Sequence, residues 1–246
     1  MSVSGDSGAG KQESAIDAVQ KNDQVLDRAL LETGGVHAMV VRDAPEQLLL
    51  TDAQRAASLD RILERRPPGA AWIFAYGSLM WNPIFLSQEQ RKATIFGFHR
   101  SFCFKVYAGR GSLANPGLVL ALDQGGECTG VAYRIGDEIL RSELDLLWRR
   151  EMLSGAYIPQ WVEVFDDARS RFGCAIAFTM DANDERYTGK LDESEVVRRL
   201  ATAAGALGSA SDYLFKTCEA LKSWDISDST LERLTLRVQE YKRDPD

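Results

Sequence analysis

The sequence predicts an α+β protein in which helices pack on a mostly antiparallel, partly closed β-barrel or sheet. Five to seven short apolar runs, separated by turn residues, lie between residues 71 and 180. One stretch with helical spacing interrupts these runs, and the chain after residue 180 has helical spacing throughout. Strands and helices therefore do not alternate regularly, as they would in a parallel α/β sheet.

The first 70 residues differ from the rest of the chain because they are charged and weakly patterned. We interpret residues 1–70 as an N-terminal extension, laid on or tethered to a core domain of residues 71–246. Its Ser- and Gly-rich start predicts disorder. A modest helix is expected over residues 14–31, ended by the two glycines that follow at 34 and 35. A second helix is expected after the N-cap residue Thr51.

The core domain begins with a buried strand. Residues 71–76 are a short apolar run that ends at the turn-forming pair Gly77-Ser78. Turn residues, including those at 115–117 and 123–126, separate the runs that follow. We therefore expect further strands at residues 93–98, 101–107, 118–122, 128–135, 161–165 and 174–180.

Helical spacing appears once between these strands and again after them. Residues 137–152 carry apolar side chains at intervals of three and four, which predicts an amphipathic helix. In the tail, Asp192 and Asp228 are the expected helix N-caps. The tail helices are expected over residues 194–204, 209–223 and 227–241.

Charge limits the classes of partner. The 246 residues include 29 Lys and Arg against 36 Asp and Glu, which gives a net charge of -7. An acidic chain without a basic run argues against nucleic acid or an anionic membrane as the main partner. The sequence has no apolar run of membrane-spanning length and no secretory signal, so we expect a cytoplasmic protein.

Histidine and cysteine are scarce. The only histidines are His37 and His99, so most histidine-based catalysis and most zinc sites are hard to build. We interpret His99, between two apolar strands, as a structural residue in preference to a ligand. The four cysteines include no Cys-x-x-Cys pair, and we expect buried free thiols in a reducing compartment rather than disulfides.

The turn after the first core strand is a candidate ligand site. Gly77 lets the backbone turn sharply or approach a ligand closely, and successive N–H groups there can form an anion-binding nest. An ordinary turn after a buried strand explains the same pattern. Ser78 lacks the surroundings of a nucleophile elbow, which argues against a serine hydrolase. Arg110, between two glycines, either binds an anion or forms a polar turn, and the pattern favours the turn.

Glu151 is the candidate for acid–base chemistry. It follows Trp148 by three positions, so it shares or borders the apolar face of the mid-chain helix. One interpretation is an ion pair with Arg149 or Arg150, or simple exposure. The other is a pocket carboxylate whose pKa is raised by burial and which acts as a general base. Tyr157 could offer a hydroxyl group beside it.

Five stretches of the core domain resemble, in the same order, the ChaC-type γ-glutamylcyclotransferases, over about residues 71–225. The Tyr-Gly-Ser-Leu sequence at 76–79 is similar to the substrate loop of that family, and Leu79 favours the ChaC type over the wider superfamily. Arg150-Glu151, followed by Gly155-Ala156-Tyr157, resembles its R-E…G-small-Y element. The other matching stretches are residues 97–102, 109–117 and 208–214.

This resemblance implies a fold and an activity. The fold is a small mixed β-barrel with flanking helices, and the reaction is cleavage of glutathione into 5-oxoproline and cysteinylglycine without metal or cofactor. The resemblance implies that Glu151 is the catalytic glutamate. Further candidates for positioning the substrate are Arg110, Tyr157 and Tyr213. The substrate loop falls on Ala75, Tyr76, Gly77, Ser78, Leu79 and Met80.

Other functions remain open at this point. The chain could be a cyclotransferase for other γ-glutamyl amines or dipeptides, or could bind γ-glutamyl peptides without cleaving them. It could also be an interaction module that works through residues 1–70. The presence of Glu151 argues against a purely binding role. The sequence indicates no oligomeric state.

Overall fold

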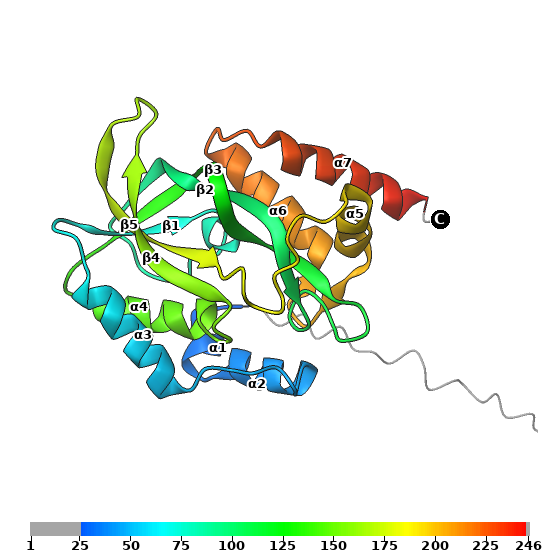
Figure 1. Cartoon of the computed structure of the whole chain (residues 1–246), viewed down its shortest axis with the longest axis horizontal. Coiled ribbons are helices and arrows are strands. Elements are labelled where there is room, and N and C mark those ends of the chain that lie inside the picture. The colour runs from blue at the N-terminus through cyan, green and yellow to red at the C-terminus, as the bar shows by residue number, and fades with distance from the viewer. Residues whose placement is uncertain (1–25, 245–246) are drawn as a thin grey trace, which may run out of the picture.

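Five strands form a closed barrel (Figure 1). In the computed structural model, which describes residues 26–244, the order around the barrel is β1-β3-β2-β4-β5. Consecutive neighbours in this order are antiparallel, whereas β5 pairs in parallel with β1 and with β3. The predicted mixed, mostly antiparallel barrel is confirmed. The strands are β1 (Ala71–Ala75), β2 (Glu89–Val106), β3 (Gly117–Ile135), β4 (Tyr157–Phe165) and β5 (Arg171–Met180).

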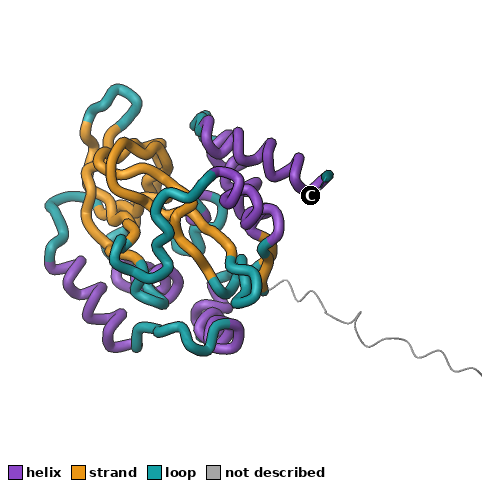
Figure 2. The backbone as a smooth tube through the Cα atoms, turned by 45° about the vertical axis from the view of Figure 1, so that its right-hand side comes forward, coloured by secondary structure: helices purple, strands orange, loops and turns teal. Residues whose placement is uncertain are grey.

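The helices form two groups beside the barrel (Figures 1 and 2). One group contains α1 (Arg28–Glu32), α2 (Gly35–Asp43), α3 (Asp52–Glu64) and α4 (Leu140–Glu151). The other contains α5 (Glu193–Thr202), α6 (Ala210–Ser223) and α7 (Ser229–Arg243). The 3-10 turn η1 (Ser78–Met80) lies between β1 and β2. A short hairpin of β6 (Ala204–Gly205) and β7 (Gly208–Ser209) lies between α5 and α6. Among residues 26–244, no helix is long and apolar enough to cross a membrane.

Four of the predicted strands are in fact halves of two long ones. The expected strands at 93–98 and 101–107 merge in β2, and those at 118–122 and 128–135 merge in β3. The predicted turn at 123–126 is therefore wrong. Gly97, Gly125 and Gly126 have positive φ at a register shift between the two strands, which marks a β-bulge. A bulge bends a long antiparallel pair and so helps to close the barrel.

The N-terminal helices differ from the prediction. The predicted disordered start and most of the helix expected over 14–31 lie outside the described residues, and α1 occupies the end of that range. The glycines at 34 and 35 do not simply end a helix: Gly34, with φ 75°, is the N-cap of α2. The helix after Thr51 is confirmed, and Thr51 and Gln54 form a capping box at its start.

The tail helices agree with the prediction to within two residues at every end. The Asp228 side chain accepts a hydrogen bond from the Leu231 N–H, as expected of an N-cap. Asp192 occupies the N-cap position of α5, but its side chain makes no capping hydrogen bond. The four cysteines are free thiols, and two of them, Cys103 and Cys128, are buried.

Helix α4 carries apolar residues into the core and ends at the site described below. Trp148 is 1% exposed, and its ring packs edge-on against Phe178 of β5 at a centroid distance of 5.2 Å. Leu144 and Leu147 of the same helix are also fully buried. Burial of side chains of this size contributes about 2 kcal/mol each. The apolar stripe thus fixes the direction in which the last turn of α4 points.

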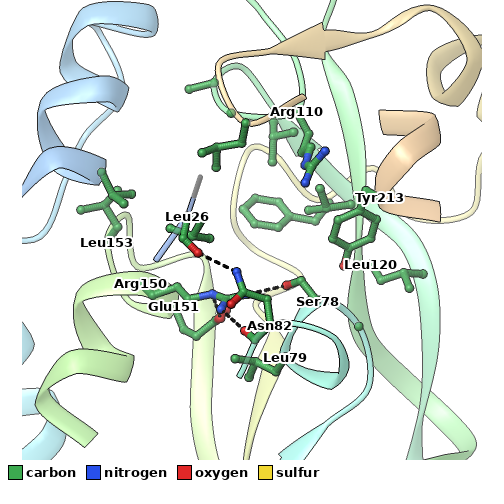
Figure 3. Close-up of a pocket in the computed structure, with 18 of the residues that line it drawn as sticks. Leu26, Ser78, Leu79, Asn82, Arg110, Leu120, Arg150, Glu151, Leu153 and Tyr213 are labelled. Carbon is green, nitrogen blue, oxygen red and sulfur yellow. Dashed lines mark hydrogen bonds and ion pairs between the residues drawn. The ribbon is translucent and has the colours of Figure 1, made fainter. Parts of the chain in front are cut away.

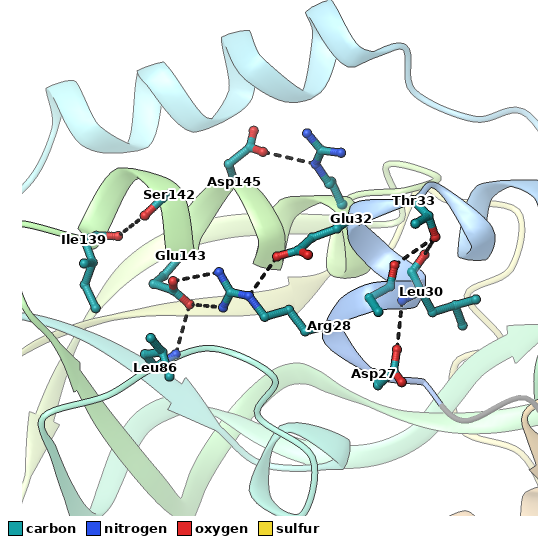
Figure 4. Close-up of polar contacts among 12 residues, drawn as sticks. Asp27, Arg28, Leu30, Glu32, Thr33, Leu86, Ile139, Ser142, Glu143 and Asp145 are labelled. Carbon is teal, nitrogen blue, oxygen red and sulfur yellow. Dashed lines mark hydrogen bonds and ion pairs between the residues drawn. The ribbon is translucent and has the colours of Figure 1, made fainter.

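Helix α4 also holds the N-terminal extension (Figure 4). Glu143, whose side chain is only 3% exposed, accepts two hydrogen bonds from the Arg28 guanidinium at 2.7 and 3.0 Å. The same carboxylate accepts a third from the Leu86 N–H at 2.9 Å. Further along, the Leu50 N–H donates to the Leu153 carbonyl at 2.9 Å. The described part of the extension is therefore bonded to the core near its start, at Arg28, and again at Leu50.

Candidate active site

A cavity of about 400 Å³ opens between the end of β1, the end of α4 and the start of α6 (Figure 3). Residues from the turn after β1, the β2–β3 connection and the N-terminal extension line it. Such a volume suits a small peptide. Of the residues singled out from the sequence, those that line the cavity are Tyr76, Gly77, Ser78, Leu79, Arg110, Glu151, Tyr157 and Tyr213.

The turn after β1 is tightly closed on itself. The Met80 N–H donates to the Gly77 carbonyl at 2.9 Å, and the Asn82 N–H donates to the Ser78 carbonyl at 2.9 Å. A Cβ on Gly77 would lie 2.7 Å from the Tyr213 hydroxyl oxygen, so no larger residue fits without a shift. Ala75 and Met80 are buried behind the turn and do not line the cavity. Their part in substrate binding stays a prediction and would be indirect.

Glu151 is the last residue of α4, and its carboxylate faces the cavity with a side chain 13% exposed. The Arg150 guanidinium lies 2.9 Å from Glu151 Oε1. Burial raises the pKa of the Glu151 carboxyl, and the Arg150 charge opposes that rise. The two interpretations left open by the sequence therefore hold together: Glu151 is ion-paired and also lies in a pocket.

Arg150 is a site residue that sequence reasoning considered only as an ion-pair partner. Its side chain is 6% exposed, and besides Glu151 it bonds to the turn after β1. It donates to Ser78 Oγ at 2.8 Å and to the carbonyl of Asn82 (Figure 3). One guanidinium thus fixes the distance between the candidate base and the candidate substrate loop. The sequence signals for this role are the Arg-Arg-Glu run and the resemblance of Arg150-Glu151 to the family's R-E element, and neither shows that the guanidinium bonds to the turn after β1.

Three mostly buried tyrosines surround the carboxylate. The Tyr76 hydroxyl donates to the Phe178 carbonyl at 2.9 Å, and Tyr157 packs between Phe104 and Phe178. Burial raises the pKa of Tyr213 to about 12, while nearby backbone N–H groups of Leu120 and Ser78 act in the opposite direction. Burial also raises the pKa of Tyr76 and of Tyr157. All three hydroxyls are therefore protonated donors at neutral pH.

Arg110 lies at the end of the cavity away from Glu151 (Figure 3). Its guanidinium donates to the Ser209 carbonyl at 3.1 Å and lies 5.9 Å from the centre of the Trp81 ring. The Lys216 ammonium lies 5.5 Å from the same ring. Asp212 also lines the cavity near Arg110: a Cβ on Gly208 would lie 2.7 Å from Arg110 Nη1 and 3.6 Å from Asp212 Oδ2. The two cations outnumber this carboxylate, so the end of the cavity is weakly positive, although the whole chain is acidic.

Arg110 also belongs to a tight turn, as its flanking glycines indicate. A Cβ on Gly111 would lie 2.2 Å from the Gly117 backbone nitrogen.

His37 and His99 are both exposed, neither lines the cavity, and His99 Nδ1 lies 3.0 Å from the Gly125 carbonyl. Within residues 26–244, no three His, Cys, Asp or Glu side chains are arranged to hold a metal ion.

Comparison with known proteins identifies the family. The family model described as ChaC-like protein matches residues 71–241. The chain belongs to the ChaC-like family. It is 43% identical over 196 residues to the glutathione-specific gamma-glutamylcyclotransferase of Escherichia coli, a match that covers 79% of this chain and 84% of that protein. It is 31% identical over 158 residues to the human glutathione-specific gamma-glutamylcyclotransferase 1, covering 63% of this chain and 71% of the human protein.

Solved structures agree with the barrel. The crystal structure of a glutathione-specific gamma-glutamyl cyclotransferase from yeast superimposes with a TM-score of 0.63 at 22% identity, covering 71% of this chain and 98% of that one. At this identity the likeness concerns the fold. In this ChaC-like protein the family match starts at Ala71, the first residue of β1. The cavity residues that come from the extension therefore precede the residues that the family model matches. The E. coli match, which covers 79% of the chain, is longer than residues 71–246 and so includes part of the extension.

Proposed function

We propose that this ChaC-like protein cleaves glutathione by cyclising its γ-glutamyl group, releasing 5-oxoproline and L-cysteinylglycine, with Glu151 as general base and then general acid. The observation that carries this proposal is the placement of Glu151. It is a mostly buried carboxylate that faces a peptide-sized cavity, held by Arg150 next to the Ser78 turn. The names of its E. coli and human relatives support the choice of substrate.

The first step needs a base because the α-ammonium group of glutathione is no nucleophile at neutral pH. A carboxylate with a pKa raised by burial accepts this proton more readily than an exposed one. The free amine then attacks the carbonyl carbon of the γ-amide in the same molecule. Holding the chain in a folded conformation makes this five-membered ring closure intramolecular, which supplies a large proximity advantage.

The attack places negative charge on the former carbonyl oxygen. Backbone N–H groups of the turn at 77–79 are the proposed donors to this oxyanion, together with a neutral tyrosine hydroxyl from Tyr213. Tyr157 is proposed to pack against the folded γ-glutamyl chain. The intermediate collapses when the carbon–nitrogen bond to cysteine breaks, and Glu151 returns its proton to the departing amine. After the attack the ring nitrogen still carries two protons, and it gives one of them to the departing amine, which leaves as an ammonium group. The steps draw on neither metal nor cofactor.

The substrate is an anion, and positive charge near the cavity balances it. Arg150 neutralises Glu151, and at the other end Arg110 and Lys216 outnumber the Asp212 carboxylate. We propose that Arg110 attracts a substrate carboxylate to that end. We also infer a cytosolic location, because a thiol substrate and the free cysteines both suit a reducing compartment.

A substrate panel tests the proposed function. Purified protein is incubated with glutathione, with other γ-glutamyl dipeptides and with γ-glutamyl amines, and release of 5-oxoproline is measured. The expected result is equal amounts of 5-oxoproline and cysteinylglycine from glutathione. Faster turnover of another γ-glutamyl compound would favour the alternative cyclotransferase. Binding of glutathione without release of product would favour a binding protein.

We further infer that residues 71–246 are the catalytic domain and residues 1–70 an accessory extension. The family match over 71–241 supports this division. A chain that begins at residue 71, checked for folding by circular dichroism, tests it. If this shortened chain folds and still releases 5-oxoproline, the chemistry belongs to the core domain. If it folds and has no activity with any γ-glutamyl compound, the division is wrong.

A further inference from the structure

The N-terminal extension supplies one wall of the cavity, although it precedes the residues that the family model matches. This wall is mostly aliphatic, whereas the Glu151 end of the cavity is polar. Its members are Leu26, Val36, Met39, Val40 and Gln47. Val36, Met39 and Val40 follow helical spacing on α2, so a single face of that helix is turned toward the cavity and the core.

The wall is bonded directly to the catalytic machinery. The Asn82 side-chain amide donates to the Leu26 carbonyl at 2.7 Å, and the Asn82 carbonyl accepts from Arg150 (Figure 3). Arg28 and Glu143 anchor the neighbouring turn of α1. These bonds fix the extension relative to Glu151, so its side chains present a defined surface to a substrate.

Met39 lies at the end of the cavity away from Glu151. A Cβ on Gly109 would lie 3.8 Å from Met39 Cε and 3.2 Å from Leu207 Cδ1, so these two side chains converge above Gly109. Gly109 is next to Arg110, which Figure 3 shows across the cavity from Glu151. Met39 itself is only 4% exposed, so packing fixes the position of the end of its side chain.

The chemistry determines which part of a substrate meets this wall. Ring closure requires the amine and the γ-carbonyl carbon to lie together at Glu151. The peptide beyond the broken bond then has the other end of the cavity to extend into, where Arg110 lies (Figure 3) and where Met39 packs over Gly109. The side chain next to that bond is the cysteine thiol in glutathione. A thiol or a short alkyl group is the kind of side chain that an aliphatic wall accommodates.

We propose that the extension is part of the substrate site and that Met39 limits the size of the side chain carried by the leaving peptide. The substrate class is γ-glutamyl peptides whose second residue has a small, weakly polar side chain, while larger S-substituted derivatives are rejected. This inference rests on the proposed function. It adds a specificity residue from a segment that precedes the residues matched by the family model.

Two substitutions that change the size of the cavity in opposite directions test the role of Met39. M39A enlarges the cavity end and M39F fills it, while V41A alters the same helix at a side chain that is 47% exposed. The kcat/KM for glutathione, S-methylglutathione and S-butylglutathione is measured for each full-length variant. Thermal unfolding checks that each variant is folded.

The measured quantity is kcat/KM for S-butylglutathione divided by kcat/KM for glutathione. We expect M39A to raise this ratio by about tenfold, the range that one or two methylene groups give in an apolar pocket. M39F lowers that ratio, and V41A leaves it unchanged. Because the two Met39 variants move the ratio in opposite directions, a general loss of stability cannot produce the result. If M39A fails to fold, the M39F arm alone decides.

The inference is overturned if folded Met39 variants keep the wild-type ratio, or if M39A and M39F change it in the same direction. That failure is separate from failure of the proposed function. If the wild-type protein releases no 5-oxoproline from glutathione, the proposed function is wrong. If it does and the ratios do not move, only the role of Met39 is wrong.

Discussion

Replacing Glu151 with glutamine (E151Q) removes the proposed proton acceptor and leaves the side-chain shape almost unchanged. The amide oxygen of the new side chain can still accept from Arg150 Nε, which lies 2.9 Å from Glu151 Oε1 in the native protein. Arg150 also keeps its bonds to Ser78 and Asn82, so the turn after β1 stays in place. The substitution therefore tests proton transfer rather than the geometry of the site.

The expected loss can be estimated from the chemistry of this site. A positioned general base contributes about 10² to 10⁴ in rate, which corresponds to about 3 to 5 kcal/mol of transition-state stabilisation. Glu151 serves both proton transfers in the proposed mechanism, so we expect kcat to fall by at least about a hundredfold. KM should change little, because the carboxylate exchanges a proton with the substrate rather than holding it by uniform binding.

The assay is 5-oxoproline release from glutathione as a function of pH. Burial raises the pKa of Glu151, and the base must be ionised to act. The wild-type rate should therefore fall as the pH drops through a value above the ordinary glutamate range. The limb set by Glu151 should be absent from E151Q, whose residual rate should instead keep rising with pH as more of the substrate ammonium group loses its proton unaided.

Glu143 provides a matched control on the same helix. Like Glu151 it is a poorly exposed glutamate paired with an arginine, but it binds Arg28 and the Leu86 N–H and does not line the cavity. E143Q should lower the melting temperature and keep kcat within about threefold of the wild type. A folded E151Q protein with near wild-type kcat and an intact acidic limb would refute the assignment of Glu151.

Three further outcomes are expected. R150Q removes the charge that lowers the pKa of Glu151, so the acidic limb of kcat/KM should move to higher pH, and an unmoved limb would contradict the ion pair. G77A places a methyl group 2.7 Å from the Tyr213 hydroxyl, so kcat/KM should fall by at least about tenfold. The double variant G77A/Y213F, compared with Y213F alone, should show a smaller loss, and an equal loss would exclude this contact as the cause. T51A breaks the capping box of α3 and should cost about 1 kcal/mol, a shift of about 2 to 4 °C in melting temperature, with glutathione turnover at 25 °C unchanged.

Local patterns in the sequence were sufficient for most elements of the fold. The apolar run before Gly77 predicts β1, because a strand buried on both faces is apolar throughout. The spacing around Trp148 predicts α4, because a helix buried on one face carries apolar residues at intervals of three and four. The errors have physical causes. Glycines at 97, 125 and 126 look like turn residues, but in β2 and β3 their positive φ values form bulges within continuous strands. Helix α2 was missed because Gly34 starts it, whereas a glycine in this position more often ends one.

By itself the sequence determined the class of fold, the candidate base and the candidate substrate loop, since each depends on residues close together in the chain. Tertiary structure decided what those residues do together. It turned Arg150, rather than Arg149, toward both Glu151 and Ser78, and it brought the Tyr213 hydroxyl onto Gly77 from far along the chain. It also placed Met39 in the cavity wall, through contacts between the extension and the core. Such contacts depend on how whole elements pack, and no spacing in the sequence encodes them.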